Sequence, residues 1–127
     1  MSEYKISDKL NYALARDNTK IEMSYAGLDD GSVWHFAEIT VQKDYLDYTF
    51  EVNCGKPTSV KELEEGLVQA VGKFVGDEDD LADRIADQYF RDNLETVNIR
   101  EAIEYGEVIK EALTELRSAL KVYLYGI

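Results

Sequence analysis

The stretch VWHFAEITVQ, residues 33–42, alternates between two sets of side chains and predicts a β-strand. One face of this strand carries His35, Ala37, Ile39 and Val41, and the other carries Trp34, Phe36, Glu38 and Thr40. The second face is aromatic at one end and polar at the other. We therefore expect either a β-bulge or a sheet that is covered on both sides at its aromatic end.

Two similar stretches flank this central strand. KIEMSYA, residues 20–26, places Ile21, Met23 and Tyr25 on one face, and YTFEVN, residues 48–53, does the same with Tyr48, Phe50 and Val52. The connections GLDDGS (27–32) and KDYLD (43–47) are short and contain the Gly and Asp residues that turns favour. Three successive strands with short connections predict a three-stranded antiparallel meander.

The segments on both sides of the meander have the periodicity of helices. Residues 7–18 predict a short helix capped by Ser7. Residues 60–75 predict an amphipathic helix with Thr58 or Ser59 as its N-cap, and Ser59 has capping-box spacing to Glu62. Gly66 and Gly72 would let this helix pack closely on the sheet. Its apolar face carries Val60, Leu63, Leu67, Val71 and Phe74.

Two further helices complete the predicted fold. The first begins near Asp77 or Asp79 and would bury Leu81, Ile85, Tyr89 or Phe90, and Leu94. The second has apolar side chains at Ala102, Ile103, Ile109, Leu113, Leu116, Leu120 and Leu124, and Gly106 either divides it or permits a close crossing. The order αβββααα predicts an α+β fold, a meander packed with about four helices, in a single domain over residues 1–127.

The net charge of −12 is concentrated in one part of the chain. There are 26 acidic and 14 basic side chains, and residues 77–95 hold eight of the acids with only Arg84 and Arg91, a net −6. Direct binding to nucleic acid or to an anionic membrane is disfavoured because both need Lys and Arg. A basic protein surface is the favoured partner, and the alternative is that the acidity only maintains solubility.

Within residues 77–95, five aspartates recur at helical spacing and form the predicted binding face. Neighbours three or four positions apart lie about 5–6 Å from each other on a helix, so Asp80, Asp83 and Asp87 form one row and Asp79 the neighbouring one. Asp92 extends the charge, and Tyr89 would supply contact area. Such a row could imitate nucleic-acid phosphates. Glu62, Glu64 and Glu65 offer a second acidic cluster.

The sequence has no recognisable catalytic, metal or phosphate motif, and we expect no cofactor. A Cys54–His35 pair is conceivable, but no flanking motif supports it, and a packed histidine is the preferred interpretation. GDEDD (76–80) fails as a calcium loop because Leu81 and Ala82 occupy positions that need an oxygen ligand and a glycine. One cysteine, no signal-peptide core and no membrane span favour a cytoplasmic protein.

These features predict a small acidic, non-enzymatic binding protein. Its most concrete form is an inhibitor that occupies the nucleic-acid-binding surface of a partner such as a defence nuclease. Phage-encoded nuclease inhibitors and immunity proteins share this general character of short, acidic, cysteine-poor chains without motifs. Two alternatives stay open: an assembly module that forms a homo-oligomer through residues 97–127, and an enzyme with an unfamiliar carboxylate site. The oligomeric state is left open.

Overall fold

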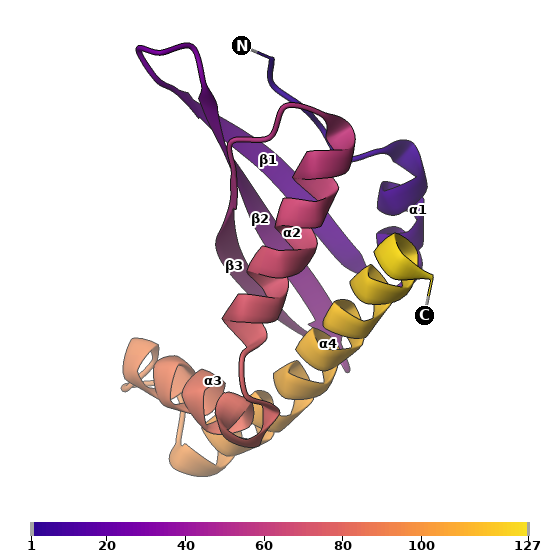
Figure 1. The fold of residues 1–127 in the computed structure, drawn as a ribbon. Coiled ribbons are helices and arrows are strands. Elements are labelled where there is room, and N and C mark those ends of the chain that lie inside the picture. Colours follow the sequence, from indigo (N-terminus) through magenta and orange to yellow (C-terminus); the bar gives the residue numbers. More distant parts are fainter. Residues whose placement is uncertain (1, 127) are drawn as a thin grey trace.

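The computed structural model describes residues 2–126 and has the α+β architecture that the sequence predicts, in the order αβββααα (Figure 1). Its elements are α1 (Asp8–Arg16), β1 (Thr19–Gly27), β2 (Val33–Lys43), β3 (Leu46–Gly55), α2 (Val60–Val75), α3 (Glu78–Asp92) and α4 (Ile99–Tyr125). Helices α1, α2 and α4 contact the sheet, whereas α3 packs mainly on α4 and projects beyond the end of the sheet (Figure 1).

The sheet is an antiparallel meander in the order β1-β2-β3, and its central strand has the face predicted for it. Ile39 lies opposite Ile21 on one side and Phe50 on the other, and the strand buries Ala37 and Val41 with it. The pairing of β2 with β3 shifts register between His35 and Phe36, where Cys54 is left unpaired between Asn53 and Gly55. The irregularity therefore lies on β3, and β2 keeps the alternation of buried and more accessible side chains without a bulge of its own. On the other face, exposed Glu22, Glu38 and Glu51 lie directly opposite one another.

Helix α2 covers β3 and begins at the predicted cap. The Ser59 hydroxyl accepts a hydrogen bond from the Glu62 amide at 3.1 Å. The two glycines of the helix differ, since a Cβ at Gly66 would lie 2.4 Å from the Cys54 carbonyl oxygen, whereas one at Gly72 would meet nothing within 4 Å. The expectation of close packing is therefore confirmed for Gly66 and wrong for Gly72.

Helix α4 is continuous over 27 residues, about 40 Å, so Gly106 does not divide it. Gly106 instead sits where α3 crosses α4, and a Cβ there would lie 2.3 Å from the Ala82 carbonyl oxygen. Three residues of the predicted apolar faces are exposed: Ile103 keeps 50% of its surface accessible, Leu94 in the loop after α3 keeps 64%, and Val60 at the start of α2 keeps 39%. The buried stripe of α4 runs through Ala102, Tyr105, Gly106, Ile109, Ala112, Leu113, Leu116 and Leu120.

The β2–β3 hairpin offers a test of turn strain. Asp44 and Tyr45 form its two-residue loop with φ of 52° and 66°, the positive angles that a type I′ turn requires and that glycine adopts without strain. Tyr45 is fully exposed. We expect Tyr45→Gly to raise the free energy of unfolding by about 0.5–1 kcal/mol in urea denaturation, because relief of the strain exceeds the entropy cost of glycine.

Tyr45→Ala keeps the Cβ and serves as the matched control, with an expected change close to zero. A less stable Tyr45→Gly variant would show that the tyrosine ring stabilises the fold by contacts that outweigh the backbone strain.

Candidate site on helices α3 and α4

Helix α3 begins with acidic residues for a local reason. The Asp77 carboxylate caps the helix by accepting a hydrogen bond from the Asp79 amide at 2.9 Å. Asp79 and Asp80 lie in the first turn, where negative charge interacts favourably with the positive end of the helix dipole. Helix capping therefore explains part of the acidity, but it does not explain the aspartates beyond the first turn.

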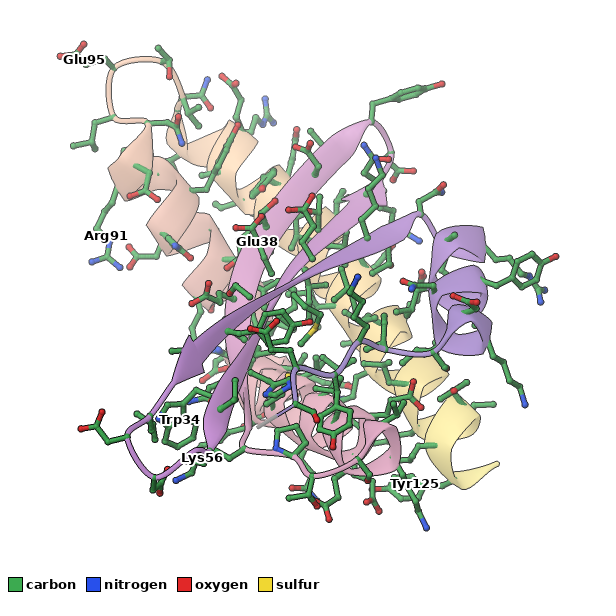
Figure 2. The ribbon with its side chains drawn as sticks, turned by 90° about the horizontal axis from the view of Figure 1, so that it is seen from above. Trp34, Glu38, Lys56, Arg91, Glu95 and Tyr125 are labelled. Atoms are coloured by element: carbon green, nitrogen blue, oxygen red, sulfur yellow. The ribbon has the colours of Figure 1, made fainter. Side chains whose placement is uncertain are left out.

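All five aspartates predicted for the binding face are exposed to solvent. The helix buries Leu81, Ile85 and Ala86 on one face, so its opposite face is exposed to solvent. Figure 2 shows Arg91 and Glu95 at the end of α3 and in the following loop, away from the sheet, whereas Glu38 lies on the sheet. Exposure of the five aspartates agrees with the prediction, but Asp92 lies toward β3 and does not share the side of α3 that carries Asp83 and Asp87.

Arginines on the same helix neutralise part of this charge. Asp80 pairs with Arg84 at 2.9 Å and Asp87 with Arg91 at 2.8 Å, each four positions apart. Both pairs are exposed, so each stabilises the helix by less than about 1 kcal/mol. Within residues 2–126, no cation lies within ion-pair distance of the remaining three members, Asp79, Asp83 and Asp92.

Arg84 has a second role at the junction between α2 and α3. Its guanidinium donates to the carbonyl oxygens of Phe74 and Val75 at the C-terminus of α2, where cations interact favourably with the helix dipole. Arg117 of α4 donates to the Gly76 carbonyl and pairs with Glu78. These arginines hold the start of α3 against the rest of the chain.

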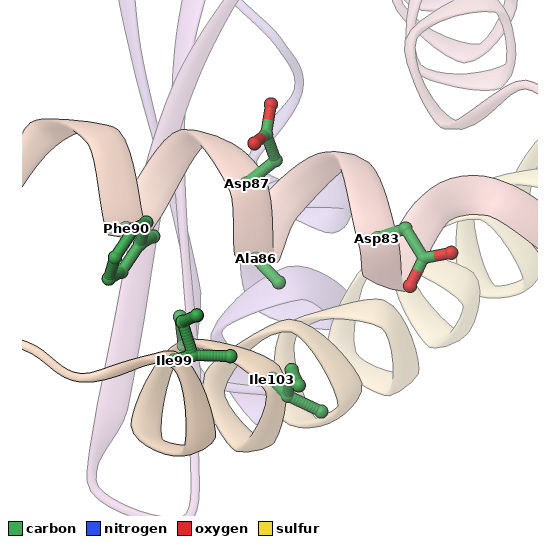
Figure 3. Close-up of a pocket in the computed structure, with 7 residues that line it drawn as sticks. Asp83, Ala86, Asp87, Phe90, Ile99 and Ile103 are labelled. Atoms are coloured by element: carbon green, nitrogen blue, oxygen red, sulfur yellow. The ribbon is translucent and has the colours of Figure 1, made fainter.

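A groove runs between α3 and the first turns of α4. Its volume is about 280 Å³, and it is lined by Asp83, Ala86, Asp87, Phe90, Ile99, Ala102 and Ile103. Figure 3 shows Phe90 and Ala86 of α3 facing Ile99 and Ile103 of α4, with Asp83 and Asp87 on the α3 side. The carboxylate of Asp87 points away from α4. The groove thus combines an apolar floor with a negatively charged edge.

Tyr89 and Asp92 lie on a different side of α3. The Tyr89 ring stacks on Tyr105 with centroids 3.9 Å apart, and the Tyr105 hydroxyl donates to the Asp47 carbonyl. Burial raises the pKa of Tyr105, and nearby Tyr89 and Asp47 add to this. Tyr89 and Asp92 line a second hollow against β3. Half-buried Tyr89 therefore packs within the chain and is not grouped with Asp83 and Asp87.

The second acidic cluster, predicted at Glu62, Glu64 and Glu65, lies far from α3, and Glu64 does not share its surface. Glu62 and Glu65 lie in the first two turns of α2, about 15–20 Å from the end that leads to α3. Hydrogen bonds from the Thr58 amide and hydroxyl lower the pKa of Glu62. Glu64 is buried, so the expectation that it belongs to the exposed cluster is wrong.

His35 and Cys54 are both buried in the interior of the fold. His35 is fully buried, its Nε2 accepts from the Tyr4 amide at 2.9 Å, and its Nδ1 lies 3.0 Å from the Val33 carbonyl oxygen. Burial raises the pKa of the Cys54 thiol to about 11, so it stays protonated at neutral pH. The packed histidine preferred from the sequence is confirmed.

Within residues 2–126, no three side chains of His, Cys, Asp or Glu are grouped in a way that could hold a metal ion. No helix formed by these residues combines the length and the apolar character needed to cross a bilayer.

The apolar half of the groove lies outside the face that the sequence predicts for binding. Ile99 is 62% exposed, and Ile103, which the helical spacing groups with the core residues of α4, is 50% exposed. The spacing did carry the signal, because Ile99 and Ile103 are four positions apart and lie off the stripe that continues through Ala102 and Gly106. The alignment of Glu22, Glu38 and Glu51 across the sheet is not predictable from the separate strands, because it depends on the register of their pairing.

Comparison of the chain with known protein families, with curated protein sequences and with solved structures gave no match.

Proposed function

We propose that this protein is a non-enzymatic binding protein whose α3 carboxylates contact a basic surface of a partner protein. The most specific form of the proposal is an inhibitor that occupies a nucleic-acid-binding surface, such as that of a nuclease. Proteins that bind nucleic acid concentrate Lys and Arg on one face, and an acidic competitor complements that face.

The observation that carries the proposal is the groove between α3 and α4. Asp83 and Asp87 border exposed Ile99 and Ile103, which places negative charge beside an apolar surface. A purely solubilising acidic face has no need of adjacent exposed isoleucines. Interfaces combine apolar anchors with a charged rim in this way.

Homo-oligomerisation through residues 97–127 is the second candidate. The exposed Val122 and Tyr125 near the end of α4 favour it, with 53% and 55% of their surfaces accessible. Most other apolar residues of the helix, including Ile109, Leu113 and Leu116, are buried within the chain itself. Sedimentation analysis separates the two candidates, because a stable dimer disrupted by Val122→Asp and Tyr125→Asp would support the assembly role.

Charge reversal tests the binding role of α3. We expect Asp80→Lys, Asp83→Lys and Asp87→Lys together to weaken binding to a basic nucleic-acid-binding partner at least 30-fold, because attraction becomes repulsion at the contact. The fold should survive, since the lost pairs to Arg84 and Arg91 are exposed. The measurement is retention of proteins from the native host on the immobilised variants, eluted with a salt gradient, followed by titration of the purified partner in competition with nucleic acid.

The sheet provides a matched control. Reversal of Glu22, Glu38 and Glu51 to Lys changes the net charge by the same +6 on a different surface. Retention lost by both variants would mean that net charge alone drives association. Unchanged binding by the α3 variant would exclude α3 as the contact surface.

A further inference from the structure

We propose that the groove between α3 and α4 accepts an amphipathic basic helix of the partner, with aliphatic side chains on the groove floor and Lys or Arg against α3. This inference rests on the proposed function and specifies the partner segment that the acidic surface binds. A helix laid in an apolar groove is a common mode of peptide recognition, in which side chains at i, i+3 or i+4, and i+7 make the contacts.

The floor of the groove is available to a partner because the fold does not use it. Ile99 and Ile103 lie off the buried stripe of α4 and keep 62% and 50% of their surfaces accessible. Half-buried Phe90 faces them from α3 (Figure 3). Covering three neighbouring apolar side chains would remove exposed surface that contributes nothing to the stability of the free chain.

The dimensions of the groove favour a short helix. On α3 it extends from Asp83 to Phe90, seven positions or about 10 Å along the axis, which equals the i to i+7 span of a partner helix. Its volume of about 280 Å³ provides room for a few side chains of such a helix.

The charges around the groove select a basic occupant. Asp79, Asp83 and Asp87 recur every four positions along α3, and exposed Glu107 follows Ile103 at the same spacing on α4. Two cations offset part of this charge: Arg91 pairs with Asp87, and exposed Arg100 follows Ile99 on α4. The four carboxylates still leave the surroundings of the groove negative. A second copy of this chain would bring the same carboxylates to the groove, so self-association there is disfavoured.

A designed peptide tests the groove directly. The probe is a 15-residue helical peptide with Leu at i, i+4 and i+7 and with Lys flanking the Leu stripe; its control has Glu in place of every Lys. We expect the Lys peptide to bind at least tenfold more tightly than the Glu peptide in 50 mM salt, with the difference shrinking as salt rises. In a spectrum of the labelled protein, amide shifts should concentrate in residues 83–90 and 99–103.

Two variants separate this inference from the proposed function. The double variant Ile99→Ser with Ile103→Ser should bind the Lys peptide at least tenfold more weakly. Val122→Ser, at a site of comparable exposure, should leave the binding of this peptide unchanged. Absent peptide binding, shifts elsewhere on the surface, or full binding by the double isoleucine variant would each overturn the helix-in-groove inference. The proposed function would still stand in those cases if the α3 charge reversal abolished partner binding, and it fails if that reversal has no effect.

Discussion

Replacing Gly106 with alanine is expected to lower the free energy of unfolding by about 3 kcal/mol. The added methyl group would lie 2.3 Å from the Ala82 carbonyl oxygen and 2.9 Å from the Ala86 Cβ, and both atoms belong to a helix that cannot yield locally. Overpacking of this kind typically costs 1–3 kcal/mol or more. The gain of about 1 kcal/mol in helix propensity does not compensate. Urea denaturation followed by circular dichroism measures the loss.

Gly72→Ala is the matched control, because Gly72 also lies inside a helix and has open space where the methyl group would go. This variant should be more stable than the natural chain by up to about 1 kcal/mol, so the same substitution changes sign between the two sites. Equal effects at both glycines would contradict the close crossing of α3 and α4. Since Ala86 lines the groove, Gly106→Ala should also lower the affinity of the groove for the basic peptide.

Local patterns were sufficient for the elements of the fold. The alternation around Ile39 identifies the central strand and its buried face, because side chains on a strand repeat with a period of two. Capping residues such as Ser7, Ser59 and Asp77 mark helix starts close to where the structure has them. These signals lie within a few residues of the feature they specify, so one sequence reveals them.

The predicted burial of a residue is wrong where that burial depends on the end of a helix or on a contact with a residue distant in the chain. Leu94 has the helical spacing of a core residue, but α3 ends at Asp92 and leaves it in the loop. Tyr89 is half-buried because it stacks on Tyr105, sixteen positions away on another helix. The acidic half of the site follows from helical periodicity, whereas its apolar half depends on how α4 is rotated against α3. That rotation is set by the Gly106 crossing.

Glu64 is buried because of contacts with residues far away in the chain, which local patterns do not reveal. Its replacement is the second substitution that we expect to destabilise the fold strongly. Its carboxylate accepts hydrogen bonds from the Ser7 amide and hydroxyl, both at 2.9 Å, and from the Tyr123 hydroxyl at 3.1 Å. These partners lie 57 and 59 positions away. We expect Glu64→Ala to lower the free energy of unfolding by about 3 kcal/mol, because the partly buried Ser7 amide loses its acceptor and the Ser7 and Tyr123 hydroxyls, 2.9 Å apart, can then bond only to each other. Hydrogen exchange should show that residues 4–16 and the end of α4 open first.

Glu65→Ala is the control for this change, since it removes an adjacent carboxylate that makes no comparable set of contacts, and its effect should stay within about 0.5 kcal/mol. Tyr123→Phe removes one donor and keeps the ring, so it should cost only about 1 kcal/mol. If Glu64→Ala matched Glu65→Ala in stability, the buried carboxylate would not hold the N-terminal segment and α4 together. The difference in the free energy of unfolding between Glu64→Ala and Glu65→Ala therefore measures how much the buried hydrogen bonds of Glu64 stabilise the fold. A large difference means that Glu64, although acidic, has a structural role in the interior and not a role in the charge of the surface.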